Sequence, residues 1–144
     1  MNRLTYWIMA ESQYRLHSPF IFEMYREVLF AELDGEVRHS LEQQFGIEPC
    51  AERHSRTYHD IVLKLCDHYH LLPTCYDEDE AVLMGQPERF GSVKVVCRPH
   101  HCRARELRWE AQKQNEKYRV SVDLFDEGLL LTNPRLHPQH FILR

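Results

Sequence analysis

The stretch YRVSVDLFDEGLLL, residues 118–131, decides how this chain folds. Apolar and polar residues alternate along its first half, as in a strand with one buried face. This alternation puts three apolar side chains on the same face: Val120, Val122 and Leu124. Asp126–Glu127–Gly128 then has the composition of a turn, and Leu129–Leu130–Leu131 continues as a second apolar strand. The stretch therefore predicts an antiparallel β-hairpin.

A strand–helix–strand unit is predicted to lead into this hairpin. Short apolar runs at 81–85 and 93–97 indicate two strands, and the arginine-rich stretch 101–116 indicates a polar helix. A last strand or docked tail is expected at 139–143. This order of elements predicts an α/β fold on a small mixed sheet.

Helices dominate the first half of the sequence. Apolar residues at three- and four-residue spacing, together with one polar segment, predict helices over residues 3–15, 19–32, 36–44 and 55–71. Ser18 suits an N-cap, and Pro19 suits the first helical position, where a missing N–H costs nothing. We expect a single domain, 1–144, with a helical segment at 1–52 and an α/β core at 53–144.

Composition excludes several classes of partner. The formal net charge is −4, whereas binding to nucleic-acid phosphates needs a surplus of Lys and Arg. No apolar run approaches the ~18 residues of a membrane span, and the apolar run near the amino terminus is too short for a signal peptide. We therefore expect a cytoplasmic protein with no nucleic-acid or membrane partner, whose five cysteines are free thiols.

Three short segments occur in an informative order. They are His17–Ser18–Pro19–Phe20, then Val122–Asp123–Leu124–Phe125 with Gly128, then His140–Phe141–Ile142–Leu143–Arg144. Together they resemble the flanks of a family of small bacterial S-adenosylmethionine-dependent methyltransferases, and residues 93–96 and 105–110 resemble its fifth strand and following helix. The resemblance covers about half of the chain. It implies a truncated, Rossmann-like methyltransferase half that ends in the C-terminal antiparallel hairpin.

The cofactor half of that family is missing from the sequence. Its cofactor site needs a glycine-rich turn after a strand, because only glycine lets the backbone approach the ligand closely. Here no two glycines lie within three residues of each other. The interval 72–93 has room for one strand rather than three, and Arg98–Pro99–His100 stands where the family has a catalytic acidic residue. We therefore expect no bound cofactor, no cofactor-binding residue and no catalytic residue.

A cluster of cysteine and histidine residues suggests a metal site as an alternative. Four potential zinc ligands fall within six residues: Cys97, His100, His101 and Cys102. Side chains so close in sequence cannot all converge on one ion, so a second pair of ligands is needed, which Cys66, His68 and His70 could supply. A Cys97/His100 nucleophile pair is also conceivable, but nothing in the sequence supplies an oxyanion site. The acidic run 77–80 could pair with the arginines of 98–119 within the same molecule.

Three functional hypotheses follow. The leading one is a non-catalytic methyltransferase-like protein that acts by binding, either as a homodimer or to another protein. The alternatives are a working methyltransferase with an unrecognised or dimer-completed site, and a small zinc-binding module. If the cofactor-side strands are lost, 81–85 or 93–97 becomes a sheet edge covered by residues 1–32 from the same or a second chain, while 120–124 stays internal.

Overall fold

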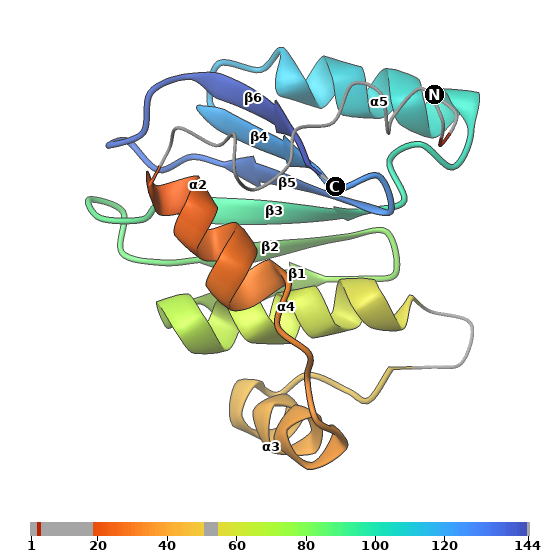
Figure 1. The fold of residues 1–144 in the computed structure, drawn as a ribbon, viewed down its shortest axis with the longest axis vertical. Coiled ribbons are helices and arrows are strands. Elements are labelled where there is room, and N and C mark those ends of the chain that lie inside the picture. Colours follow the sequence, from red (N-terminus) through yellow and green to blue (C-terminus); the bar gives the residue numbers. More distant parts are fainter. Residues whose placement is uncertain (1–2, 4–18, 51–54, 144) are drawn as a thin grey trace.

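The computed structural model describes Arg3, residues 19–50 and residues 55–143. Within these residues six strands form one mixed sheet in the order β1–β2–β3–β5–β4–β6 (Figure 1). The strands are β1 Leu72–Tyr76, β2 Glu80–Met84, β3 Ser92–Cys97, β4 Val120–Asp123, β5 Glu127–Leu131 and β6 Gln139–Ile142. The helices are α2 Pro19–Glu23, η2 Met24–Leu29, α3 Gly35–Phe45, α4 Arg56–Tyr69 and α5 Arg103–Lys113. The predicted α/β class is confirmed, while the helix expected over 3–15 and the motif residues His17 and Ser18 lie outside the described residues.

The C-terminal half contains the predicted strand–helix–strand unit and hairpin. Strands β3 and β4 run in the same direction and are joined through α5, and β5 lies between them antiparallel to both. The last strand, β6, pairs parallel to β4 on its other side. The prediction that residues 120–124 are internal is therefore confirmed for β4.

The first half of the sheet differs from the expectation. Strands β1, β2 and β3 form an antiparallel meander, so the interval 72–93 holds two strands where we predicted one. Both β2 and β3 have neighbours on each side, and the prediction that one of them is an edge is wrong. The edge on this side of the sheet is β1, whose sequence Leu-Pro-Thr-Cys-Tyr shows no apolar alternation because none of its residues is buried. Pro73 and an irregularity between Pro73 and Cys75 blunt this edge against further strand pairing.

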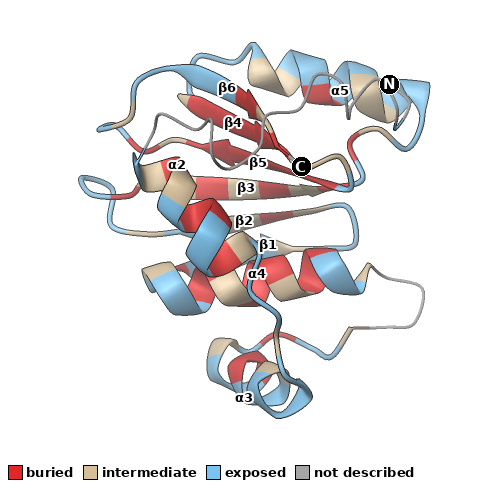
Figure 2. Ribbon diagram, viewed as in Figure 1, coloured by how far each residue is buried: buried red, intermediate tan, exposed pale blue. Residues whose placement is uncertain are grey.

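The two faces of the sheet are covered differently. One face is apolar and packs against α4, α2 and η2, which lie together over the sheet in Figure 1. Its strand residues include Ala81, Leu83, Val93, Val95, Val120, Val122, Leu129 and Leu131. The opposite face is covered by α5, whose one buried residue is Trp109. Burial is concentrated in β3, β4, β5 and α4, whereas β1 remains largely outside the core (Figure 2).

Local signals explain where the helices begin and end. Ser55 caps α4 by accepting from the backbone N–H of Tyr58, and His70 ends the helix in the left-handed region at φ 55°. The helix predicted over 19–32 is divided into α2 and η2, a π-helix that ends at Leu29. Ile21, Met24, Tyr25 and Val28 from this segment are buried against the same chain. Among the described residues no helix is both long and apolar enough to cross a membrane.

Candidate functional site

The carboxyl ends of β3 and β4, which run in the same direction, are where this sheet could form a ligand site of the doubly wound kind. Doubly wound folds bind their ligands in a crevice between the ends of neighbouring parallel strands. Strand β3 has antiparallel neighbours on both sides, β2 and β5, so no such crevice forms beside it. The loop after β3 instead turns sharply through Arg98, at φ 49°, whose backbone N–H donates to the carbonyl of Asp126.

The loop after β3 carries a buried histidine at the end of β4. The His100 side chain is 3% exposed, and its ring is stacked on Phe125. Its Nε2 lies 2.6 Å from Asp123 Oδ2, and its Nδ1 lies 3.1 Å from Glu106 Oε1. Two carboxylates therefore hold the ring in one orientation and join the loop to β4 and α5.

The C-terminal motif residues of the resemblance meet at this same place. Asp123 accepts from Trp109 Nε1 at 3.2 Å and from the Phe125 backbone N–H at 2.9 Å. The absence of a side chain at Gly128 lets the Trp109 indole lie directly on the sheet. Leu124 packs against the core from a partly buried position. All of these contacts are internal to the fold.

The N-terminal motif contributes packing where it is described. Pro19 begins α2, and the Phe20 ring lies 5.7 Å from that of Tyr69 and 5.9 Å from that of Phe90. These aromatic contacts fix α2 to the end of α4 and to the loop after β2.

The four candidate zinc ligands point to different surroundings. Cys97 is buried on the core face of β3, and burial raises the pKa of its thiol to about 11. His100 is held between the carboxylates on the opposite side, while His101 and Cys102 are exposed. In the described part of the chain no three metal-ligating side chains are grouped to hold an ion. The raised thiol pKa also opposes the Cys97/His100 nucleophile pair, which would need a thiolate.

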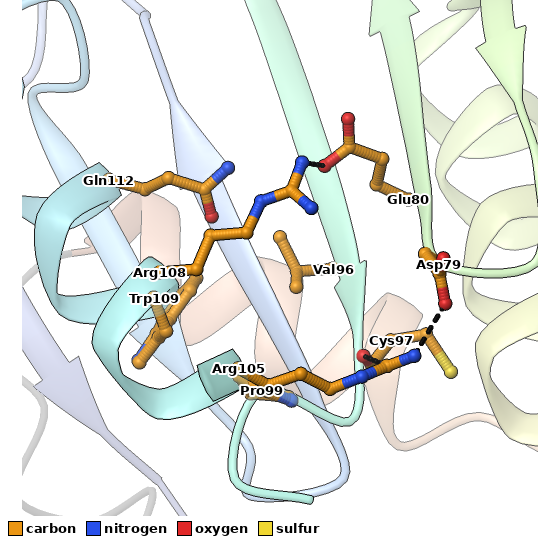
Figure 3. Close-up of a pocket in the computed structure, with 9 residues that line it drawn as sticks. All are labelled: Asp79, Glu80, Val96, Cys97, Pro99, Arg105, Arg108, Trp109 and Gln112. Atoms are coloured by element: carbon orange, nitrogen blue, oxygen red, sulfur yellow. Dashed lines mark hydrogen bonds and ion pairs between the residues drawn. The ribbon is translucent and has the colours of Figure 1, made fainter. Parts of the chain in front are cut away.

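The acidic run pairs with α5, as we expected from the sequence. Arg105 binds Asp79 Oδ1 at 2.6 Å and also donates to the Cys97 carbonyl, and Arg108 lies 3.2 Å from Glu80 Oε2. Figure 3 shows these side chains bridging from α5 to β2 across the end of β3. The space that they enclose is about 60 Å³, enough for water but not for a ligand.

A cleft of about 540 Å³ lies on the other side of the acidic run, between the end of α3, α4 and β1. This volume is within the range of small-molecule sites. Its lining residues are Phe45, Gly46, Ile47, Glu48, Pro49, Cys50, His59, Pro73, Thr74, Cys75, Tyr76, Asp77 and Glu78. The cleft is thus formed by the part of the fold that differs most from the expected methyltransferase half.

A hydrogen-bonded relay is built into the wall of this cleft. His59 Nε2 lies 2.8 Å from Glu42 Oε2, and the side chains are 2% and 7% exposed. On the other side of the ring, Nδ1 lies 2.6 Å from the Tyr76 hydroxyl. The relay connects α3, α4 and β1 in one line of polar contacts.

Further contacts fix the geometry of the relay. Arg38 on α3 makes a two-point ion pair with Asp60 on α4, at 2.7 and 2.9 Å, which holds the helix that carries Glu42. The Tyr76 ring stacks on Tyr58, whose hydroxyl donates to the carbonyl of Asp77. Burial raises the pKa of the Tyr76 hydroxyl, which therefore keeps its proton at neutral pH.

Our reading of the sequence missed this relay. The contacts join residues 42, 59 and 76, which no short motif links. The only local signal is His59, which lies one residue from the apolar stripe of the predicted helix 55–71 and is buried with it. A buried histidine needs polar partners, but the sequence does not say which residues supply them.

Comparisons with protein-family models, with curated proteins and with solved structures give no match for this chain. The methyltransferase resemblance therefore stands on the quoted motifs alone.

Proposed function

We propose that this chain is a methyltransferase-like protein that does not transfer methyl groups and acts by binding. The observation that carries the proposal is the antiparallel meander β1–β2–β3. It replaces the parallel strands whose carboxyl ends would form a nucleoside crevice. The side chains at the ends of β3 and β4 are engaged with each other, as the His100–Asp123 contact illustrates.

Ligand-binding calorimetry with S-adenosylhomocysteine and S-adenosylmethionine tests this proposal. We expect no saturable heat from S-adenosylhomocysteine. A dissociation constant tighter than about 100 μM, a free energy on the order of −5.5 kcal/mol, would overturn the proposal and favour a working methyltransferase. Binding only above the concentration at which the chain dimerises would point to a dimer-completed site.

We propose a second copy of the chain as the binding partner. Leu72 on β1 and Met84 on β2 face each other across the strand pair and are 65% and 41% exposed. They lie on the same face of the sheet as α5, at a part of that face which α5 does not cover. A homodimer about a two-fold axis would bring this apolar pair of one chain against the same pair of its partner and so cover both.

The oligomeric state is measured by size-exclusion chromatography with light scattering. We expect the mass of two chains for the native protein and of one chain for Leu72→Ser/Met84→Ser. Phe30→Ser, which also replaces an exposed apolar side chain but lies at the end of η2, is the control and should stay dimeric. A native protein that is monomeric at about 100 μM would refute the partner assignment.

A further inference from the structure

We infer that the cleft between α3, α4 and β1 binds a small organic cation, a molecule with an ammonium or guanidinium group. The inference rests on the proposed function, a protein that acts by binding, and adds a small-molecule ligand to the second copy of the chain proposed above. It rests on the direction of the hydrogen bonds in the cleft wall, on the charges of the lining residues and on the aromatic side chains among them.

The relay sets the role of the Tyr76 oxygen when His59 is neutral. A carboxylate only accepts hydrogen bonds, so in this form His59 donates from Nε2 to Glu42, 2.8 Å away. Its Nδ1 is then an acceptor, and the Tyr76 hydroxyl donates to it across 2.6 Å. With His59 in this form, the hydroxyl proton is engaged inside the wall. Only oxygen lone pairs remain to face the cleft, and they favour a ligand that donates hydrogen bonds.

Thr74 repeats the same pattern on the neighbouring part of β1. Its hydroxyl donates to the backbone carbonyl of Val82 at 3.2 Å, so its oxygen also remains an acceptor. Two hydroxyl oxygens of the cleft lining are therefore oriented as acceptors by bonds within the protein. A ligand rich in N–H groups matches this arrangement, and an anion does not.

The charges of the lining point to the same class of ligand. Three carboxylates line the cleft, those of Glu48, Asp77 and Glu78, and none of its described lining residues is Lys or Arg. Asp77 is fixed in place because its Oδ1 accepts from the backbone N–H groups of Asp79 and Glu80. Two cations act on the lining residue Cys50, Arg56 and Arg38, and both oppose the larger effect of burial, which raises the pKa of its thiol.

Aromatic side chains complete the recognition of a cation. Phe45 and Tyr76 line the cleft with Pro49 and Pro73. An aromatic face attracts an ammonium or guanidinium group through its quadrupole. Acceptor oxygens, carboxylates and two aromatic side chains thus occur together in the lining, a combination that suits a positively charged donor.

An NMR titration of the full chain tests the inference. Agmatine, which carries a guanidinium and an ammonium group, is the probe, and glutarate, which is anionic, is the opposite charge control. We expect saturable shifts of the amide signals of residues 46–50 and 73–78 with agmatine and none with glutarate. A peptide with a single lysine, acetyl-Gly-Lys-Gly-amide, distinguishes a free amine from a protein side chain as the source of the cation.

Substitutions locate the binding in the cleft. Tyr76→Phe removes the acceptor oxygen and should weaken agmatine about 3- to 10-fold, in the range of one hydrogen bond. Glu48→Gln should weaken it about 2- to 5-fold, and Arg56→Gln should strengthen it about 2-fold. Glu88→Gln, an exposed carboxylate in the loop after β2, is the matched control and should leave binding unchanged. Circular dichroism confirms that each variant is folded.

The outcomes separate this inference from the function on which it rests. If neither agmatine nor the lysine peptide binds at 10 mM, a probe concentration that saturates a dissociation constant of about 1 mM, the cation site is wrong. Equal binding to native protein and Tyr76→Phe, or preferential binding of glutarate, refutes it as well. S-adenosylhomocysteine also carries an ammonium group, so its binding bears on the non-catalytic proposal only if Tyr76→Phe and Glu48→Gln leave that binding unchanged. Such binding would refute the non-catalytic proposal and leave the cation site standing.

Discussion

Substitution of Gly128 by Ala tests whether the motif glycine serves packing. A Cβ built at this position would lie 2.5 Å from Trp109 Cη2, 2.7 Å from Cζ3 and 3.0 Å from Cζ2. Cβ contacts under 3.0 Å essentially never occur, so the indole has to move. It has little freedom to do so, because the Trp109 side chain is 1% exposed and its Nε1 donates to Asp123.

The expected cost follows from the kind of clash. An added methyl group in a well-packed region destabilises a protein by about 1–3 kcal/mol. For a domain of this size, that loss corresponds to a fall of roughly 3–9 °C in the melting temperature. Gly35 provides the control, because a Cβ there meets only the end of the Arg38 side chain, at 3.9 Å. Gly35→Ala at the start of α3 should change the free energy of unfolding by less than about 0.5 kcal/mol.

Urea unfolding followed by circular dichroism measures both variants. A double-mutant cycle then identifies the cause, because Trp109→Phe removes the benzo ring that the new methyl group would meet. In the Trp109→Phe background, Gly128→Ala should cost at least about 1 kcal/mol less than in the native protein. Equal stability of Gly128→Ala and the native protein, or no coupling with Trp109→Phe, would refute the packing role.

Three further predictions concern other parts of the fold. Burial, with a smaller contribution from Asp126, raises the pKa of Glu127 from 4.5 to about 7. The folded chain therefore holds a proton that the unfolded chain has released, and stability falls by roughly 3 kcal/mol as the pH rises through this window. Glu127→Gln should remove this loss of stability, which is measured from melting temperatures at pH 5 and pH 8. If the melting temperature of the variant changes between the two pH values as much as that of the native protein, the prediction is contradicted. Deletion of residues 1–32 removes Ile21, Met24, Tyr25 and Val28 from the core and should cause aggregation, whereas a monodisperse, folded truncation in light scattering would show that α2 and η2 are dispensable. Chelators should leave the melting temperature of the native protein unchanged. The metal hypothesis would be restored if the native protein held stoichiometric zinc and Cys97→Ser/Cys102→Ser lost both the zinc and the fold.

Two of the elements that sequence patterns predicted, β3 and α4, have a continuous apolar face. Strand β3 and helix α4 agree with the apolar runs that predicted them, since each buries one side against the core. Strand β1 was missed because its residues are mainly outside the core, where burial imposes no alternation. Pro73 lies in this edge strand, a position that tolerates proline.

Less of the candidate site than of the fold could be predicted from the sequence, and the physical reason is different. The four residues of the Cys/His cluster are adjacent in sequence but separate in space, because Cys97 ends a strand and the chain then turns at Arg98. The relay shows the reverse case, since Glu42, His59 and Tyr76 are far apart in sequence and meet through packing of α3, α4 and β1. Spacing along the chain reports local geometry, and both sites depend on contacts between distant elements.

The C-terminal motif that carries the methyltransferase resemblance has a sufficient explanation in folding. Asp123 orients His100 and Trp109, Phe125 stacks on His100, and Gly128 makes room for Trp109. Each residue type is required by a contact inside this chain, whatever ligand the protein binds. A match to Asp-Leu-Phe followed by Gly therefore indicates a β-hairpin packed under a tryptophan-bearing helix. The match does not indicate a cofactor site, because a cofactor would have to be recognised by groups that face a cavity. In this fold such groups gather at the cleft beside β1, at the opposite end of the sheet from the motif.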